Sequence, residues 1–150
     1  MLLNKRKLTN VSRLKKLQQA QVKQELMSVQ KAAEEHQNKQ SAFEKKQAEL
    51  EQSVQTFNKH FQSDNLSPVV MGNANAVIAQ EEVACKQAKQ AAREARESLE
   101  GVLSGYLNSK KNMDWLEKQK RFFQSELNTE VQKIETEELT QLHSSRGGKQ

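Results

Sequence analysis

The side chains that could carry catalysis or bind a metal are few and scattered. The two that stand out are His36, within a polar stretch, and Cys85, the single cysteine. One cysteine cannot form an internal disulfide, and no metal-ligand pattern surrounds it. The chain also lacks a GxxxxGKS/T phosphate loop, an HExxH motif and paired cysteines. The sequence therefore predicts no enzyme, no catalytic residue, no metal site and no cofactor, with Cys85 an inert thiol.

The composition predicts long solvated helices rather than a compact core. Only 35% of the 150 residues are hydrophobic and 5% are aromatic, against roughly 45–50% apolar residues in an ordinary domain. The polar residues are mostly helix formers, with one Pro and five Gly in the whole chain. No apolar run is long enough for a secretory signal or a membrane-spanning helix. We therefore expect a cytoplasmic protein without membrane insertion.

In the first half, mostly apolar residues recur at alternating steps of four and three. This is the spacing of a coiled-coil seam, the narrow stripe of a helix that faces a partner helix. Three of its members are polar, and we interpret them as positions that fix the register rather than as a pH switch or ligand site. The seam consists of Val22, Leu26, Val29, Ala33, His36, Gln40, Phe43, Gln47, Leu50, Val54, Phe57 and Phe61.

A second seam occupies the other half. Alanines from Ala84 to Ala95 precede it, and the step from Ala95 to Leu99 predicts a stutter that relaxes the supercoil. Gly101 and Gly105 form a GxxxG motif, which in an aqueous helix indicates a slight bend or flexible point rather than a packing face. The seam members are Leu99, Val102, Tyr106, Ser109, Met113, Leu116, Lys120, Phe123, Leu127, Glu130 and Ile134.

Pro, Gly, Asn and Ser cluster only between the two seams, which predicts a single turn there. The predicted fold class is all-α, a long two-helix antiparallel coiled-coil hairpin forming a single domain over 1–150. Its predicted parts are a helix over 4–62, a turn over 63–75, a second helix over 76–142 and a frayed tail over 143–150.

Antiparallel pairing of the two seams sets Leu8 against Ile134 and Phe43 against Leu99. Each seam position then meets the complementary position of the other helix. A slip by one heptad stays open, as does a homodimeric tether in which each seam pairs between two chains.

The net charge of +5 is concentrated near the start, where basic residues precede the first acid, Glu25. Without interleaved aromatics or a base-reading module, this cluster predicts no nucleic-acid binding. It is either a solvated face or a contact for an acidic protein surface, formed by Lys5, Arg6, Lys7, Arg13, Lys15 and Lys16.

Apolar side chains gather at the predicted hairpin tip, where no long core exists to bury them. They either cap the coiled coil or form a patch that binds a partner. These residues are Leu66, Val69, Val70, Met71, Val77 and Ile78.

The basic start LLNKRKLTNVSRLKKLQQAQ, the uninterrupted hairpin and the segment WLEKQKRFFQSELNTEVQKIETEEL together resemble a known family. They resemble the small stalk proteins of bacterial type III export, of the FliJ (flagellar) and YscO (injectisome) type. The resemblance covers most of the chain as length and architecture rather than as a strict motif.

The resemblance implies a protein similar to the gamma subunit of rotary ATP synthases. The terminal segments, here 3–22 and 120–142, would enter the pore of a hexameric export ATPase, which adds Arg121 to the cationic contacts. The tip would reach the export gate protein, and export chaperones are further partners of some members. It implies a monomer in the cytoplasm, peripheral to the inner-membrane secretion apparatus. The alternative is an export chaperone or chaperone escort.

Overall fold

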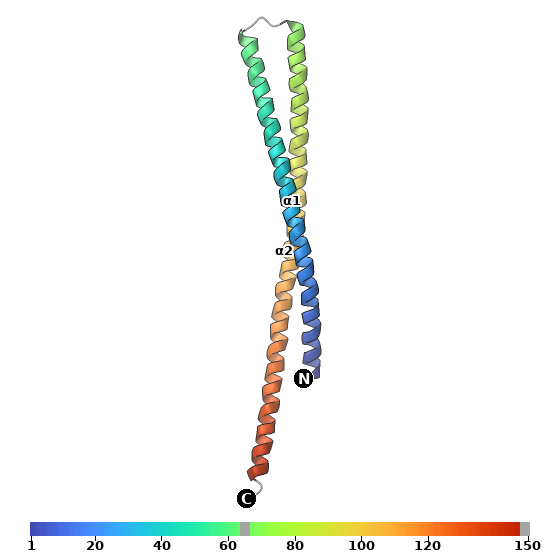
Figure 1. Cartoon of the computed structure of the whole chain (residues 1–150), viewed down its shortest axis with the longest axis vertical. Helices are drawn as coiled ribbons and strands as arrows, with labels where there is room; N and C mark the ends of the chain where they lie inside the picture. The colour runs from blue at the N-terminus through green and yellow to red at the C-terminus, as the bar shows by residue number, and fades with distance from the viewer. Residues whose placement is uncertain (64–66, 148–150) are drawn as a thin grey trace. The chain divides into compact units, whose positions relative to one another are not determined.

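The computed structural model describes residues 1–63 and 67–147, which form two α-helices (Figure 1). The first, α1, is Leu2–Ser63, and the second, α2, is Pro68–Gly147. The two helices pack against each other and run antiparallel, and no strand occurs within the described ranges. The predicted all-α, two-helix fold class is confirmed. Leu66, one of the predicted tip contacts, lies outside the described residues.

Each helix contributes to two compact units. Unit 1 consists of Met1–Glu25 with Tyr106–Gln150, and unit 2 is Leu26–Gly105. Each unit therefore contains one segment of α1 packed on one segment of α2.

The start of α2 is set by a serine cap. The Ser67 hydroxyl accepts a hydrogen bond from the backbone N–H of Val70 (3.3 Å), and the Ser67 carbonyl accepts one from Met71 (3.0 Å). Ser67 is thus the N-cap, and Pro68 occupies the first helical position, where its missing N–H costs nothing. The predicted start of the second helix at residue 76 was wrong. Pro68, Gly72 and the polar residues near them are helical and form the first turns of α2 rather than the connection between the helices.

The earlier start of α2 also changes which residues face each other in unit 1. Lys15 forms an ion pair with Glu117, whereas the predicted register places Leu127 opposite Lys15. Asn4 donates a hydrogen bond to Glu130, and the Gln18 amide donates one to the Ser109 carbonyl (3.1 Å). The predicted pairing of Leu8 with Ile134 was therefore wrong by about ten residues, more than the one-heptad slip that had been left open.

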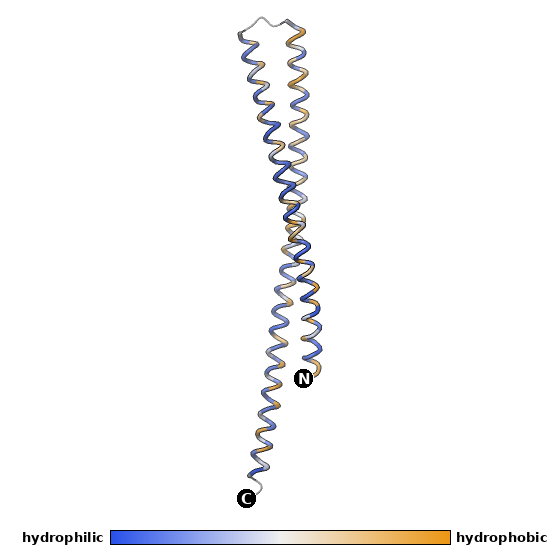
Figure 2. Tube along the Cα trace, in the orientation of Figure 1, coloured by the Kyte–Doolittle hydropathy of each residue, from blue (hydrophilic) through white to orange (hydrophobic). Residues whose placement is uncertain are grey.

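The core of unit 1 is a single layer of seam side chains. On α2, burial recurs at intervals of three and four residues from Tyr106 to Glu130, and Leu116 (8% exposed) and Ser109 (6%) are its most buried members. Ile134, a predicted seam member, is 39% exposed. Figure 2 shows the same pattern, with hydrophobic turns recurring between hydrophilic ones along both helices.

In unit 2, the inward face of α2 is broad and consists mostly of alanine. Cys85, Ala88, Ala92, Ala95 and Leu99 all face inward, and Ala92 is only 5% exposed. This spacing contains no inserted step, but the predicted seam positions Ala84 and Ala91 are partly buried as well, so the stutter after Ala95 stays a prediction.

A phase step occurs in α1, where the inward positions Ala32, His36 and Gln40 are separated by two successive intervals of four. His36 and Gln40 occupy the seam as predicted. Four predicted seam members are exposed and were wrong: Leu26, Ala33, Gln47 and Phe61.

Alanine at Gly101 and Gly105 is expected to stabilise the protein. Both glycines are exposed and helical, neither has positive φ, and an added Cβ would meet no atom within 4 Å. The GxxxG motif is therefore no packing face. Because glycine weakens a helix interior relative to alanine, each substitution should add about 0.5–1 kcal/mol to the free energy of unfolding. Urea titration followed by circular dichroism measures this, and a loss of stability would show that an unseen contact needs the glycines.

Candidate functional site

Four of the predicted cationic contacts form a ridge on the outer face of α1 in unit 1. The cationic ridge consists of Lys5, Arg6, Arg13 and Lys16, all exposed. A shallow hollow runs between them, lined by Lys5, Arg6, Thr9, Asn10 and Arg13. At 100° per residue these positions share one side of the helix, opposite the seam. None of the four forms an ion pair with another described residue, so the ridge presents uncompensated positive charge to solvent.

The other three predicted contacts lie against α2 or on it and are engaged there. Lys15 is 19% exposed at its side chain and is ion-paired with Glu117. Lys7 lies 5.6 Å from the centroid of the Phe123 ring, a cation–π contact between the two helices. Arg121 Nε is 3.5 Å from Glu117 on its own helix, although its side chain is 79% exposed. Lys15 and Lys7 therefore help to hold the helices together.

Glu117 is the electrostatic centre of this interhelical contact. The hydrogen bond from Lys15 lowers the pKa of the Glu117 carboxyl below its ordinary value of 4.5, with further lowering from the charges of Lys15, Arg121 and Lys120. Partial desolvation of the carboxyl opposes the shift. The carboxylate form is thus favoured in the folded chain.

The shift predicts a pH dependence that Glu117→Gln should reduce. A carboxyl whose folded pKa is lowered contributes stability above its unfolded pKa, and that contribution is lost as the pH falls through the folded value. The wild type should therefore lose stability below about pH 4.5 more steeply than Glu117→Gln. Thermal melts from pH 7 to pH 2 measure the difference. Glu137→Gln, on the same helix but exposed, is the control, and identical pH profiles for Glu117→Gln and wild type would contradict the prediction.

An exposed leucine stripe accompanies the cationic ridge and was not predicted as a site. Leu3, Leu14 and Leu17 are 63%, 53% and 70% exposed. Their positions share the side of α1 between the seam and the ridge. The signal was present in the sequence, because these leucines fall out of phase with the inward residues Leu8 and Val11.

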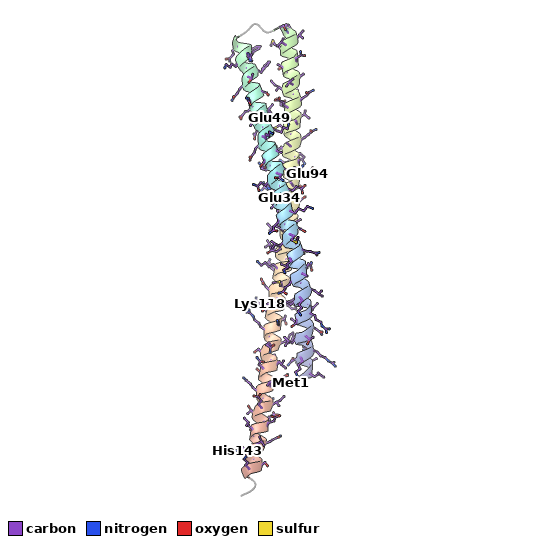
Figure 3. The ribbon with its side chains drawn as sticks, viewed as in Figure 1. Met1, Glu34, Glu49, Glu94, Lys118 and His143 are labelled. Atoms are coloured by element: carbon purple, nitrogen blue, oxygen red, sulfur yellow. The ribbon has the colours of Figure 1, made fainter. Side chains whose placement is uncertain are left out.

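The end of α2 in unit 1 has no helical neighbour among the residues that the structure describes. Every residue from Val131 to Arg146 is exposed, and Figure 3 shows His143 beyond Met1, where no part of α1 lies alongside. This segment carries both apolar and acidic side chains, namely Val131, Ile134, Glu135, Glu137, Glu138, Leu139 and Leu142.

Unit 2 contains an open hollow of about 730 Å³ between the end of α1 and the start of α2. Its apolar lining includes Phe57, Val70, Val77 and Ile78, and polar residues such as Glu49 and Glu81 line it as well. Of the predicted tip contacts, Val70, Val77 and Ile78 line the hollow, Val69 is 72% exposed and Met71 is half-buried.

Over residues 1–63 and 67–147, no group of three or more His, Cys, Asp and Glu side chains gathers as a metal site would require. Neither helix contains, in its described part, a segment long and apolar enough to cross a bilayer. The chain matches no protein-family model, no curated protein and no solved structure.

Proposed function

We propose that this chain is the central stalk component of a type III export ATPase, coupling the hexamer to the export gate by protein–protein contacts. The observation that carries the proposal is the cationic ridge of Lys5, Arg6, Arg13 and Lys16, exposed and unpaired within the described residues. The first 24 residues contain no acid that could neutralise it. The resemblance to FliJ-type and YscO-type stalk proteins points to the same role.

The ridge suits an acidic pore lining on physical grounds. Clustered charge steers association and sets orientation, whereas apolar contacts supply most of the binding energy. The exposed Leu3, Leu14 and Leu17 lie beside the ridge and can provide that apolar contact. Together they give a surface that binds a charged pore without any chemistry of its own.

The apolar hollow of unit 2 is the proposed contact for the export gate. Val70 and Val77 leave 48% and 52% of their surface exposed there and are available to an apolar surface of a partner. In this role the protein is a cytoplasmic monomer, peripheral to the inner-membrane secretion apparatus.

Titration of a purified hexameric export ATPase with this protein tests the proposal. Binding should promote hexamer assembly or raise ATP hydrolysis, and it should weaken with salt because screening shortens the reach of the ridge charges. Absence of binding at low ionic strength, together with normal secretion in a deletion strain, would exclude the stalk function.

A chaperone escort is the second candidate, favoured by the apolar hollow of unit 2. Val77→Asp would place a carboxylate in that hollow. Loss of a co-purifying chaperone or secreted substrate in Val77→Asp, with ATPase stimulation intact, would support the escort function for unit 2.

A further inference from the structure

Aromatic and lysine side chains alternate along the outer face of α2 in unit 1. Lys111, Trp115, Lys118 and Phe122 follow one another at intervals of four, three and four residues and are all exposed. We call these four the aromatic–lysine ladder. Trp115 and Phe122 keep 59% and 55% of their surface in solvent. Large aromatic rings are costly to leave in water and are enriched at protein interfaces.

The ladder faces away from α1. Trp115 and Phe122 each lie two residues after a seam position, Met113 and Lys120, which turns them about 200° from the seam. Figure 3 labels Lys118 on this part of α2. A partner on the ladder would therefore approach α2 from the side away from α1.

The charges on this face differ at its two ends. Lys111 precedes the aromatic rings, and Glu126, also exposed, lies one turn after Phe122. Neither has an ion-pair partner among residues 1–63 and 67–147. This face has a cation at one end, a carboxylate at the other and two aromatic rings on either side of Lys118. Its ends and its rings are complementary to those of a second copy that runs in the opposite direction.

We propose that the ladder binds the ladder of a second copy of this chain, forming an antiparallel two-fold dimer through α2. With the axis passing between Lys118 and Gln119, Trp115 of each copy meets Phe122 of the other. Lys111 then lies opposite Glu126 at both ends. An anionic lipid surface fits less well, because Asp114 and Glu126 border the rings.

The exposed area predicts a reversible dimer. An aromatic side chain can bury about 150–250 Å², so the four partly exposed rings of two copies contribute roughly 400–500 Å². A specific interface buries about 1,200 Å² or more in total. Leu107, 48% exposed on the same face, and the lysine stems supply much of the rest. We expect dissociation in the micromolar range.

This inference goes beyond the proposed function and uses a different face from the cationic ridge. The dimer is the free form of the chain, and the stalk acts as a single copy. Failure of one proposal therefore leaves the other standing, because the ladder and ridge can be altered separately.

Sedimentation equilibrium between about 1 and 200 μM tests the dimer, since dissociation in the micromolar range falls within it. The wild type should show a reversible monomer–dimer equilibrium. Trp115→Ser with Phe122→Ser should weaken it by at least about tenfold, as removal of interface aromatics typically does. Leu139→Ser with Leu142→Ser is the matched control, because these residues are 66% and 59% exposed outside the ladder. A wild-type monomer throughout the range, or equal weakening by both pairs, would overturn the proposal.

Charge exchange tests the register. Lys111→Glu and Glu126→Lys should each weaken the dimer by placing like charges together, and the two substitutions combined should restore it. Failure of the combined variant to recover would overturn the antiparallel register.

Cross-linking tests the position of the axis. In a Cys85→Ser background, Lys118→Cys should form an intermolecular disulfide under mild oxidation. Lys133→Cys should not, because its two copies would lie about 40 Å apart along the helices. Binding of phosphatidylserine vesicles without cross-linking would overturn the dimer in favour of a lipid surface.

Discussion

Replacement of Leu116 by alanine is expected to lower the free energy of unfolding by about 3 kcal/mol. Leu116 is 8% exposed, and Ala92 is the only other buried hydrophobic residue in the described chain. Truncation of a buried leucine removes its transfer free energy and leaves a cavity, which together cost about 2–5 kcal/mol. A two-helix core has few other contacts to share the loss. Urea unfolding followed by circular dichroism at 222 nm measures it.

Leu107→Ala is the matched control for Leu116→Ala. Leu107 belongs to the same helix and unit but is 48% exposed. Its truncation should change the free energy of unfolding by about 0.5 kcal/mol or less, measured well below the dimer concentration range. Equal losses in the two variants would contradict the assignment of Leu116 to the core.

If the proposed stalk function holds, reversal of the cationic ridge is expected to reduce binding to a hexameric export ATPase by at least about 100-fold at low salt. The variant carries glutamate at Lys5, Arg6, Arg13 and Lys16 and changes the net charge from +5 to −3. The ridge residues form no ion pairs with other described residues, so the fold should tolerate the change. Fluorescence anisotropy at several salt concentrations measures the affinity and its salt dependence.

A control variant with four charge reversals elsewhere separates the effect of the ridge from the effect of net charge. Glutamate at Lys31, Lys45, Lys86 and Lys89 gives the same net charge, and all four side chains are exposed in unit 2. This control should retain most of the affinity. Equal losses in both variants would indicate non-specific attraction, and no loss in the ridge variant would exclude the ridge from the interface.

The helical fold class could be predicted from seam spacing, but the register could not. Spacing alone identifies the face of a helix that packs, whereas the pairing of two faces depends on where the connection ends. That point was decided by Ser67 and Pro68, whose cap starts α2 within a stretch that its Pro, Gly and Asn content marked as a turn. α2 begins eight residues earlier than predicted. This difference is close to the shift of about ten residues between the predicted and observed pairing of the helices.

The parts of the candidate site that depend on residue type could be predicted from the sequence. The parts that depend on how the two helices pair could not. The cationic ridge followed from the basic start of the chain. Lys15 was predicted as a contact from its place in the basic start of the chain. Its ion pair with Glu117 depends on the observed register, which the sequence did not predict. Trp115 and Phe122 were not predicted as a site because they lie outside the seam spacing that predicts the packed face.

The position of Gly105 has a consequence for how the chain melts. Both helices continue from one unit into the other, so order can propagate between the units through helical hydrogen bonding. On α2 the boundary falls directly after Gly105, with Gly101 one turn earlier, and glycine weakens such propagation. Calorimetry should therefore show two partly separate transitions in the wild type. Alanine at both positions should merge the two transitions into a single, sharper transition. The two glycines would then determine how cooperatively the whole chain unfolds.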